Sequence, residues 1–184
     1  MCEESPRERI GRPRRSRRIY EGRVVSLRVD EVESGDGRSR PYEVVEHPGA
    51  VCVVAQPEPG RIVMVRQYRP AIDRYLWEVP AGKLDPGETA VDCAVRELRE
   101  ETGYRCERMR ELWSFFTSPG FCDERLHLCV AEGVVPGPPE PEPYEEIRVE
   151  VMPVDEAWAM VTRDEIPDAK TQIALAWTRA RRRS

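Results

Sequence analysis

Residues 81–104 read AGKLDPGETAVDCAVRELREETGY, and this stretch decides how the rest of the chain is interpreted. Four of its apolar residues fall at positions i, i+3, i+4 and i+7, on one face of a helix with 3.6 residues per turn: Val91, Ala94, Val95 and Leu98. Thr89, with Asp92 three residues later, resembles a capping box, and Gly103 stands where a glycine commonly ends a helix. The sequence therefore predicts a helix over residues 89–102.

The same helix carries an acidic cluster, because Glu97, Glu100 and Glu101 also fall at i, i+3 and i+4. Like charges at this spacing destabilise a helix by roughly 0.2–0.5 kcal/mol per pair, and the helix dipole disfavours anions near the C-terminal end. One interpretation is a solvated acidic face that Arg96 and Arg99 compensate. The other is a site for a hard cation such as Mg²⁺, which prefers oxygen ligands.

The surroundings of the helix favour the cation site. The stretch matches the pattern G-x5-E-x7-R-E-U-x-E-E-x-G-U, where U is a bulky aliphatic residue, with tyrosine at the last position: Gly82, Glu88, Arg96, Glu97, Leu98, Glu100, Glu101, Gly103 and Tyr104. This resembles the Nudix box. The resemblance implies a Nudix hydrolase, which cleaves a nucleoside diphosphate linked to a further group by attack of water at phosphorus, assisted by divalent cations.

The resemblance also implies roles for the residues of the box. The metal ligands would be Glu97, Glu100, Glu101 and the backbone carbonyl of Ala81, holding Mg²⁺ with Mn²⁺ as the alternative cation. Glu100 and Arg96 also count among the catalytic residues, with Arg96 orienting a box carboxylate through a bidentate contact. The structural residues of the box would be Gly82, which permits close approach of the backbone, Glu88, which braces the loop, and Gly103.

The remainder of the chain predicts an α+β fold, in which a Nudix-type mixed β-sheet is sandwiched between helices and preceded by a small antiparallel β-sheet. Strands are expected at residues 50–55, 62–65, 76–79, 109–115, 126–135 and 147–153, and further helices at 155–161 and 168–181. The expected division is a disordered Arg- and Pro-rich tail (1–17), a β-rich dimerisation segment (18–46) and a catalytic domain (47–181), with an extended loop at 136–143.

Three stretches outside the box resemble the ADP-ribose pyrophosphatase branch of the family. They are the Ser118-Pro119-Gly120 element, the segment 66–82 that contains Arg69, and the segment EHPGAV at 46–51. The resemblance implies substrate contacts from all three residues of the first element, from Arg69 and Glu124, and from Arg40 of a homodimer partner whose N-terminal sheet is exchanged. The alternatives are an ordinary turn at 118–120 and a solvent-exposed Arg69 at a strand end.

The residue that activates water is expected in PEPYEEIRVEV, residues 141–151, where the resemblance implies a catalytic glutamate on a loop. The acidic pattern there departs from the usual one, because Pro143 stands where a carboxylate is expected. Glu142 and Glu145 both remain candidates. We favour Glu145, which adjoins the strand expected from Ile147 and would also bind metal, because a mobile loop can carry it into the site.

Composition and charge limit the class of protein. The net charge of −5 argues against a general nucleic-acid binder, and no apolar run approaches the roughly 20 residues that a membrane span needs. The N-terminus has no apolar signal segment, and the six cysteines are scattered, so we expect reduced cysteines and a cytoplasmic location.

The function that we expect from the sequence is Mg²⁺-dependent hydrolysis of ADP-ribose, to AMP and ribose 5-phosphate, or of a related nucleoside diphosphate sugar. The alternatives are a Nudix pyrophosphatase for GDP-mannose, a dinucleoside polyphosphate or an oxidised dNTP, and a ligand-sensing Nudix module without catalysis. The last alternative is disfavoured because such modules usually lose box carboxylates, and this chain keeps all of them.

Overall fold

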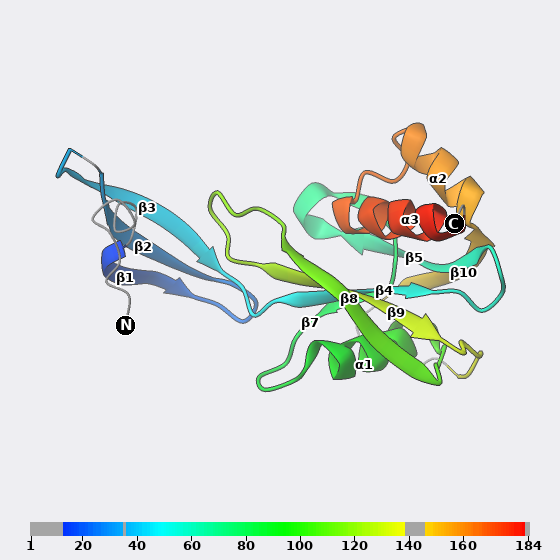
Figure 1. Ribbon diagram of the computed structural model, residues 1–184. Coiled ribbons are helices and arrows are strands. Elements are labelled where there is room, and N and C mark those ends of the chain that lie inside the picture. Colours follow the sequence, from blue (N-terminus) through cyan, green and yellow to red (C-terminus); the bar gives the residue numbers. More distant parts are fainter. Residues whose placement is uncertain (1–12, 35, 139–145, 183–184) are drawn as a thin grey trace. The chain divides into compact units, whose positions relative to one another are not determined.

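The computed structural model describes residues 13–34, 36–138 and 146–182, which divide into two compact units (Figure 1). The small unit comprises residues 1–49 and 116–125, and the large unit comprises residues 50–115 and 126–184. Each is described by itself. Most of the loop expected at 136–143 lies outside the described residues.

The small unit is built on an antiparallel sheet in the order β1-β2-β3, from strands β1 (Pro13–Glu21), β2 (Ser26–Glu33) and β3 (Ser39–Glu46). The sequence-based expectation of a small N-terminal antiparallel sheet is confirmed. Part of the expected tail at 1–17 is a strand, because residues 13–17 pair with β2. Ladder hydrogen bonds are made by the backbone, so an arginine-rich stretch can form a strand without the apolar alternation that identifies one in a sequence.

The loop at 116–125 belongs to the small unit and not, as the sequence suggested, to the catalytic domain. The backbone N–H of Val45 donates to the carbonyl of Phe121 at 2.7 Å, and the N–H of Asp123 donates to the carbonyl of Val45 at 3.1 Å. These bonds join the loop to the end of β3. They connect residues more than 70 positions apart, which is why no local pattern indicated them.

The large unit contains two sheets. A mixed sheet has the order β7-β4-β9-β8 and an antiparallel sheet has the order β10-β5-β6. Strand β4 pairs in parallel with β9 and antiparallel with β7. The strands are β4 (Ala50–Ala55), β5 (Arg61–Arg69), β6 (Arg74–Glu78), β7 (Ala81–Lys83), β8 (Arg108–Phe116), β9 (Arg125–Glu132) and β10 (Ile147–Pro153), with the 3₁₀ helix η2 (Pro70–Ile72) between β5 and β6.

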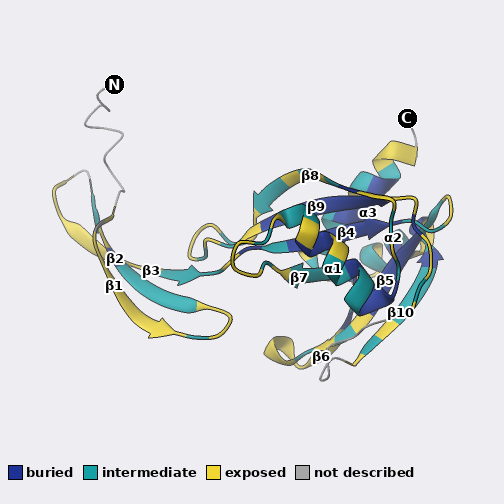
Figure 2. Ribbon diagram, turned by 90° about the horizontal axis from the view of Figure 1, so that it is seen from below, coloured by how far each residue is buried: buried dark blue, intermediate teal, exposed yellow. Residues whose placement is uncertain are grey.

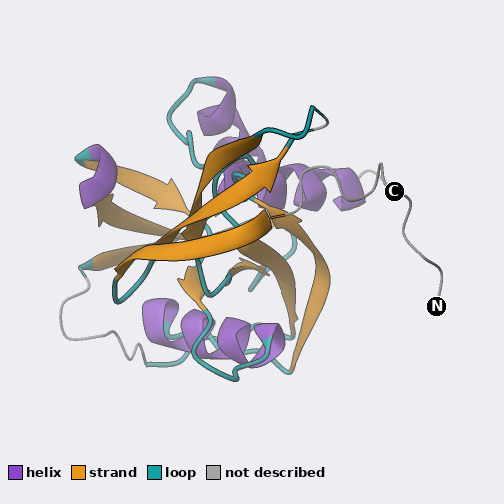
Figure 3. Ribbon diagram, turned by 90° about the vertical axis from the view of Figure 1, so that its left-hand side faces the viewer, coloured by secondary structure: helices purple, strands orange, loops and turns teal. Residues whose placement is uncertain are grey.

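Helices cover the strands of the large unit from both sides (Figures 1 and 3). Helix α1 (Ala90–Thr102) packs on one apolar cluster, and α2 (Val154–Thr162) and α3 (Ala169–Arg182) pack on another. Strand β4 lies between the two, with Cys52 and Val54 in the cluster of α2 and α3 and Val53 in the cluster of α1. This explains the uninterrupted apolar run AVCVVA, because both faces are buried (Figure 2). The predicted α+β class is confirmed.

Helix α1 ends where the sequence predicts and begins one residue later, but its buried face differs from the predicted apolar stripe. Val95 is 43% exposed, while Ala94, Leu98 and Glu101 are buried. The buried face is therefore rotated toward Glu101, so that a carboxylate lies against the sheet. A spacing argument that counts only apolar residues misses this rotation.

Two further expectations from the sequence concern the state of the cysteines and the presence of membrane-spanning segments. The five cysteines in the described part of the chain are all free thiols, and burial raises the pKa of Cys129 to about 12. None of the described helices is both long enough and apolar enough to cross a membrane.

Candidate active site

Helix α1 presents the acidic cluster because both of its ends are fixed locally. The hydroxyl of Thr89 accepts from the N–H of Asp92 at 3.2 Å at the first turn. Gly103 has φ of 74°, a left-handed conformation that favours glycine, and its N–H donates to the carbonyl of Arg99 at 2.8 Å. These caps set the helix register and with it the direction of the glutamates in the last two turns.

Glu101 joins the helix to strand β7. Its side chain is 5% exposed, and Oε2 accepts a hydrogen bond from the backbone N–H of Ala81 at 3.0 Å. A carboxylate that accepts a backbone N–H in a buried setting is held in one position. The fold thus brings the carboxylate of Glu101 to the backbone N–H of Ala81, the residue whose carbonyl is the further expected ligand.

Gly82 lies directly against Glu97. A Cβ atom built on Gly82 would lie 1.9 Å from both Cδ and Oε1 of Glu97, a distance that no real pair of atoms tolerates. The absence of a side chain therefore lets the backbone of β7 approach the carboxylate. This contact is the structural reason for a glycine at the first position of the box.

Arg96 connects three glutamates of the box. Its Nε and Nη2 donate to the two oxygens of Glu88, each at 2.9 Å, in a bidentate arrangement. Its Nη1 donates to Glu97 at 2.7 Å and to Glu100 at 3.1 Å. Hydrogen bonding to Glu88 first, and then to Glu97 and Glu100, raises the pKa of Arg96 above its ordinary value. The guanidinium thus supplies positive charge among carboxylates that would otherwise repel one another.

The pairing with Arg96 has a measurable consequence for Glu88. Hydrogen bonds from Arg96 lower the pKa of Glu88 to about 2, and a backbone hydrogen bond from Asp85 acts in the same direction. A carboxyl group with a lowered pKa in the folded chain contributes stability above its unfolded value, near 4.5, and loses that contribution as the pH falls toward 2. We expect urea unfolding to show a smaller loss of stability over this pH range in Glu88→Gln than in the wild type.

The control for this measurement is Glu150→Gln, which removes an exposed carboxylate paired with Arg148. Its stability should follow the wild-type pH dependence, because exposed ion pairs contribute little. If the Glu88→Gln and wild-type stabilities fell in parallel between pH 4.5 and 2, the pairing of Glu88 with Arg96 would not stabilise the fold.

The donor set suits a hard cation. Glu97, Glu100, Glu101 and the Ala81 carbonyl offer only oxygen atoms, the ligands that Mg²⁺ prefers, and the glycine at 82 leaves space beside Glu97 for a close approach. With the side chains as they stand, the described residues contain no group of three or more His, Cys, Asp or Glu side chains that could hold a metal ion. The guanidinium of Arg96 is the positive group between Glu97 and Glu100, because it donates hydrogen bonds to both.

Arg69 lies in the same unit and is held by a residue that sequence reasoning missed. Its Nε and Nη2 each donate to Glu78 at 2.7 Å, and the Glu78 side chain is 1% exposed. The pKa of Arg69 is raised, first by hydrogen bonding to Glu78 and also by the charge of Glu101. The charge of Glu101, in the acidic cluster of the box, therefore acts on the guanidinium of Arg69. The available signal for Glu78 was a charged residue inside the otherwise apolar stretch LWEV, residues 76–79.

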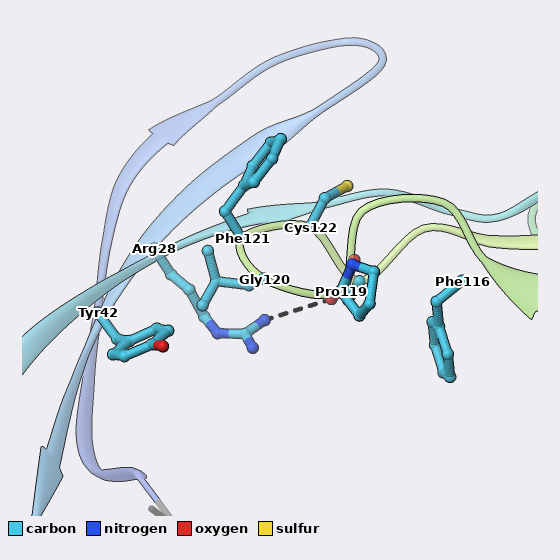
Figure 4. A pocket seen from close by; sticks show the side chains of 9 residues that line it. Arg28, Tyr42, Phe116, Pro119, Gly120, Phe121 and Cys122 are labelled. Carbon is cyan, nitrogen blue, oxygen red and sulfur yellow. Dashed lines mark hydrogen bonds and ion pairs between the residues drawn. The ribbon is translucent and has the colours of Figure 1, made fainter. Parts of the chain in front are cut away.

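The other substrate-contact candidates lie in the small unit. The carbonyl of Ser118 accepts from the N–H groups of Phe121 and Cys122, at 3.1 and 2.9 Å, which closes the turn that contains Pro119 and Gly120. Pro119 and Gly120 line a pocket of about 330 Å³, together with Arg28, Tyr42, Val44, Phe116, Phe121, Cys122 and Asp123 (Figure 4). Ser118 does not line it.

The sequence reasoning missed two charged residues in this pocket, Arg28 and Asp123. The dashed line in Figure 4 marks the contact of Arg28 with Asp123 at 3.5 Å. Its Nη1 also donates to Glu46 at 2.9 Å, which, with Asp30, raises the pKa of Arg28. Arg40 is exposed on β3 opposite Val32, and its side chain does not line the pocket.

Glu124 does not line the pocket either. It accepts from the hydroxyl of Thr117 at 2.6 Å and lies 3.6 Å from His47 Nδ1. Glu142 and Glu145, the candidates for activating water, lie outside the described residues.

Comparisons with known proteins agree with this geometry. The model of the NUDIX domain matches residues 45–174. The chain is 42% identical over 161 residues to the ADP-ribose pyrophosphatase of Bacillus subtilis, covering 86% of this chain and 87% of that protein. It is 45% identical over 168 residues to the methanol dehydrogenase activator of Bacillus methanolicus, covering 89% of each.

A solved structure shows the same fold. The crystal structure of an ADP compounds hydrolase matches with a TM-score of 0.80 at 21% sequence identity, covering 95% of this chain and 97% of that one. The match to the domain model spans most of the chain, including the capped helix and its glutamates. The prediction from the box is confirmed, and the chain belongs to the Nudix family.

Proposed function

We propose that this Nudix hydrolase splits ADP-ribose into AMP and ribose 5-phosphate in a Mg²⁺-dependent reaction. The observation that carries the proposal is the complete box, in which Glu97 and Glu101 lie against strand β7 and Arg96 bridges Glu88, Glu97 and Glu100. The choice of substrate is supported by the similarity to ADP-ribose pyrophosphatases, 42% identical in Bacillus subtilis and 41% identical in Mycobacterium tuberculosis.

In the proposed mechanism Glu97, Glu100, Glu101 and the Ala81 carbonyl would hold the cation. A bound divalent ion neutralises diphosphate charge and lowers the pKa of water, which supplies a nucleophile near neutral pH. Arg69, with one edge of its guanidinium fixed on Glu78, would present the remaining N–H groups to a phosphate oxygen. Arg96 would keep the box carboxylates oriented.

The chemical step adds water across the diphosphate bridge. The oxygen of water forms a bond to one phosphorus while the bond from that phosphorus to the bridging oxygen breaks, and the bridging oxygen leaves with the electron pair on the other phosphate. We propose that Glu145, with Glu142 as the alternative, accepts the proton of the attacking water. Replacing each by glutamine would identify the base, since the correct variant loses the acidic limb of the pH–rate profile, where protonation of the base stops the reaction.

We also propose substrate contacts in the small unit by Arg40, Ser118, Pro119, Gly120 and Glu124. The support for Pro119 and Gly120 is the 330 Å³ pocket that they line, where the exposed rings of Tyr42 and Phe121 can stack on a planar group. Arg40, Ser118 and Glu124 do not line this pocket and are proposed from the resemblance to ADP-ribose pyrophosphatases. Tyr42→Ala should therefore raise KM. A homodimer and a cytoplasmic location are further proposals, and sedimentation equilibrium tests the first of them.

Substrate choice and cation dependence are tested by one panel of initial rates. We expect ADP-ribose to be hydrolysed with a higher kcat/KM than GDP-mannose, diadenosine polyphosphates or oxidised dNTPs in Mg²⁺, with Mn²⁺ as a substitute. Excess EDTA should abolish the activity and added Mg²⁺ should restore it, because the metal carries several kcal/mol of the transition-state stabilisation. A preference for another compound of the panel would overturn the substrate and leave the reaction class intact.

A further inference from the structure

Four side chains of alternating charge form a network from strand β5 to the start of helix α3. Arg69 pairs with Glu78, Glu78 accepts a hydrogen bond from Lys170, and Lys170 Nζ donates to Asp168 at 2.9 Å. The side chains of Glu78, Lys170 and Asp168 are 1%, 14% and 17% exposed. These four residues lie in the large unit with the box, but the mechanism above uses only Arg69 and Glu78.

The first turn of α3 places Lys170 beside Glu78. Asp168 precedes the helix and accepts from the N–H of Thr171 at 3.0 Å and from its hydroxyl at 2.6 Å. The hydroxyl of Thr171 in turn accepts from the backbone N–H of Val79 at 3.0 Å. Helix α3 is thereby fixed against the end of β6, one residue from Glu78 and two residues before Ala81.

Both members of the central pair remain charged. Burial alone would raise the pKa of Glu78, but hydrogen bonding to Arg69 and the charge of Lys170 outweigh it and lower the pKa. Burial alone would likewise lower the pKa of Lys170, but the charges of Asp168 and Glu78 outweigh it and raise the pKa. A buried carboxylate between two cations can neutralise only one of them.

The charges of the four side chains in this network can be balanced. Asp168 lies at the positive end of the helix dipole, which compensates part of its charge. Glu78 is shared between Lys170 and Arg69. If Lys170 were absent, Glu78 would be matched by Arg69 alone, and the pair would present little net charge to an anion.

We propose that Lys170 is a positioning residue for the hydrolysis: it neutralises Glu78, so that Arg69 keeps its charge for the diphosphate of the substrate. This inference rests on the proposed function. It assigns to the start of α3 a role in substrate affinity that the box itself does not carry.

The test compares steady-state kinetics for Lys170→Met and Glu78→Gln/Lys170→Met in the full chain. In Lys170→Met the network of four charged side chains gains one net negative charge. We therefore expect KM for ADP-ribose to rise about tenfold, with kcat within about threefold of wild type. The double variant removes both charges and restores neutrality. Its KM should return to within about threefold of wild type, a rescue that a purely structural role for Lys170 would not produce.

Arg163→Met is the matched control, since Arg163 forms an exposed ion pair with Glu165 in the loop before α3. Its KM should stay within about twofold of wild type. The proposal is overturned if Lys170→Met leaves KM unchanged, or if the double variant keeps the high KM of Lys170→Met. Should Lys170→Met fail to fold, the double variant decides the question, because a tenfold rise in its KM over wild type would contradict the charge argument.

Failure of the proposed function gives a different result. If the wild type does not hydrolyse ADP-ribose, the same KM ratios are measured with whichever diphosphate of the panel it does hydrolyse. If Arg69→Met has the wild-type KM, Arg69 does not bind the diphosphate, and the inference about Lys170 is refuted with it.

Discussion

Glu101→Gln should lower kcat about 1,000-fold while the protein stays folded, because loss of a proposed metal ligand removes several kcal/mol of transition-state stabilisation and each 1.36 kcal/mol is tenfold in rate. Glutamine keeps the volume of Glu101 and a carbonyl oxygen that can accept the Ala81 N–H, so the junction between α1 and β7 persists. Initial rates in saturating Mg²⁺ measure the loss, and urea unfolding verifies the fold.

The control for this prediction is again Glu150→Gln, which removes a glutamate that is 43% exposed and lies outside the box. It should retain wild-type kcat. A folded Glu101→Gln protein with kcat within tenfold of wild type would exclude Glu101 as a metal ligand. Binding and signalling without turnover in both the wild type and the variant would instead favour the ligand-sensing alternative.

Gly82→Ala should lower kcat about 100-fold, because a methyl group at residue 82 overlaps the Glu97 carboxylate and displaces it from strand β7. The new Cβ would lie 1.9 Å from Glu97 Oε1, so either the side chain or the strand must move. Affinity for Mn²⁺, measured by electron paramagnetic resonance, should fall together with kcat. This pairing of effects distinguishes a displaced ligand from a loss of stability.

Gly87→Ala separates this steric effect from backbone strain in the same loop. Gly87 has φ of 81°, and a Cβ there would meet nothing within 4 Å. We expect its free energy of unfolding to fall by about 1 kcal/mol while Mn²⁺ affinity stays unchanged. Equal losses of Mn²⁺ affinity in the two variants would show that general strain in the loop, and not contact with Glu97, explains the effect of Gly82→Ala.

Local signals in the sequence were sufficient for helix α1. Thr89 and Gly103 define its ends through hydrogen bonds to residues three or four positions away, and the spacing of the glutamates fixes their common ridge. The bidentate contact between Arg96 and Glu88 spans only eight residues. Such features depend on chain geometry that is nearly independent of the remaining fold.

The same reasoning was insufficient where contacts join distant parts of the chain. Val95 is exposed and Glu101 is buried because the helix is rotated by its packing on the sheet, which helical periodicity alone cannot reveal. The assignment of the loop 116–125 to the small unit depends on hydrogen bonds with Val45. Strand β1 begins at Pro13 within a composition that is typical of a tail.

The sequence by itself therefore determined the family, the α+β class and the box helix with its acidic ridge, because the box and each helix or strand are set by residues close together in the chain. Only the tertiary structure decided which groups meet across longer separations. It places Lys170 on Glu78, 92 residues earlier in the chain, and so gives Arg69 a buried, charge-balanced support. The physical reason is that a buried charge persists only with a partner, and in this case the partner is supplied by folding.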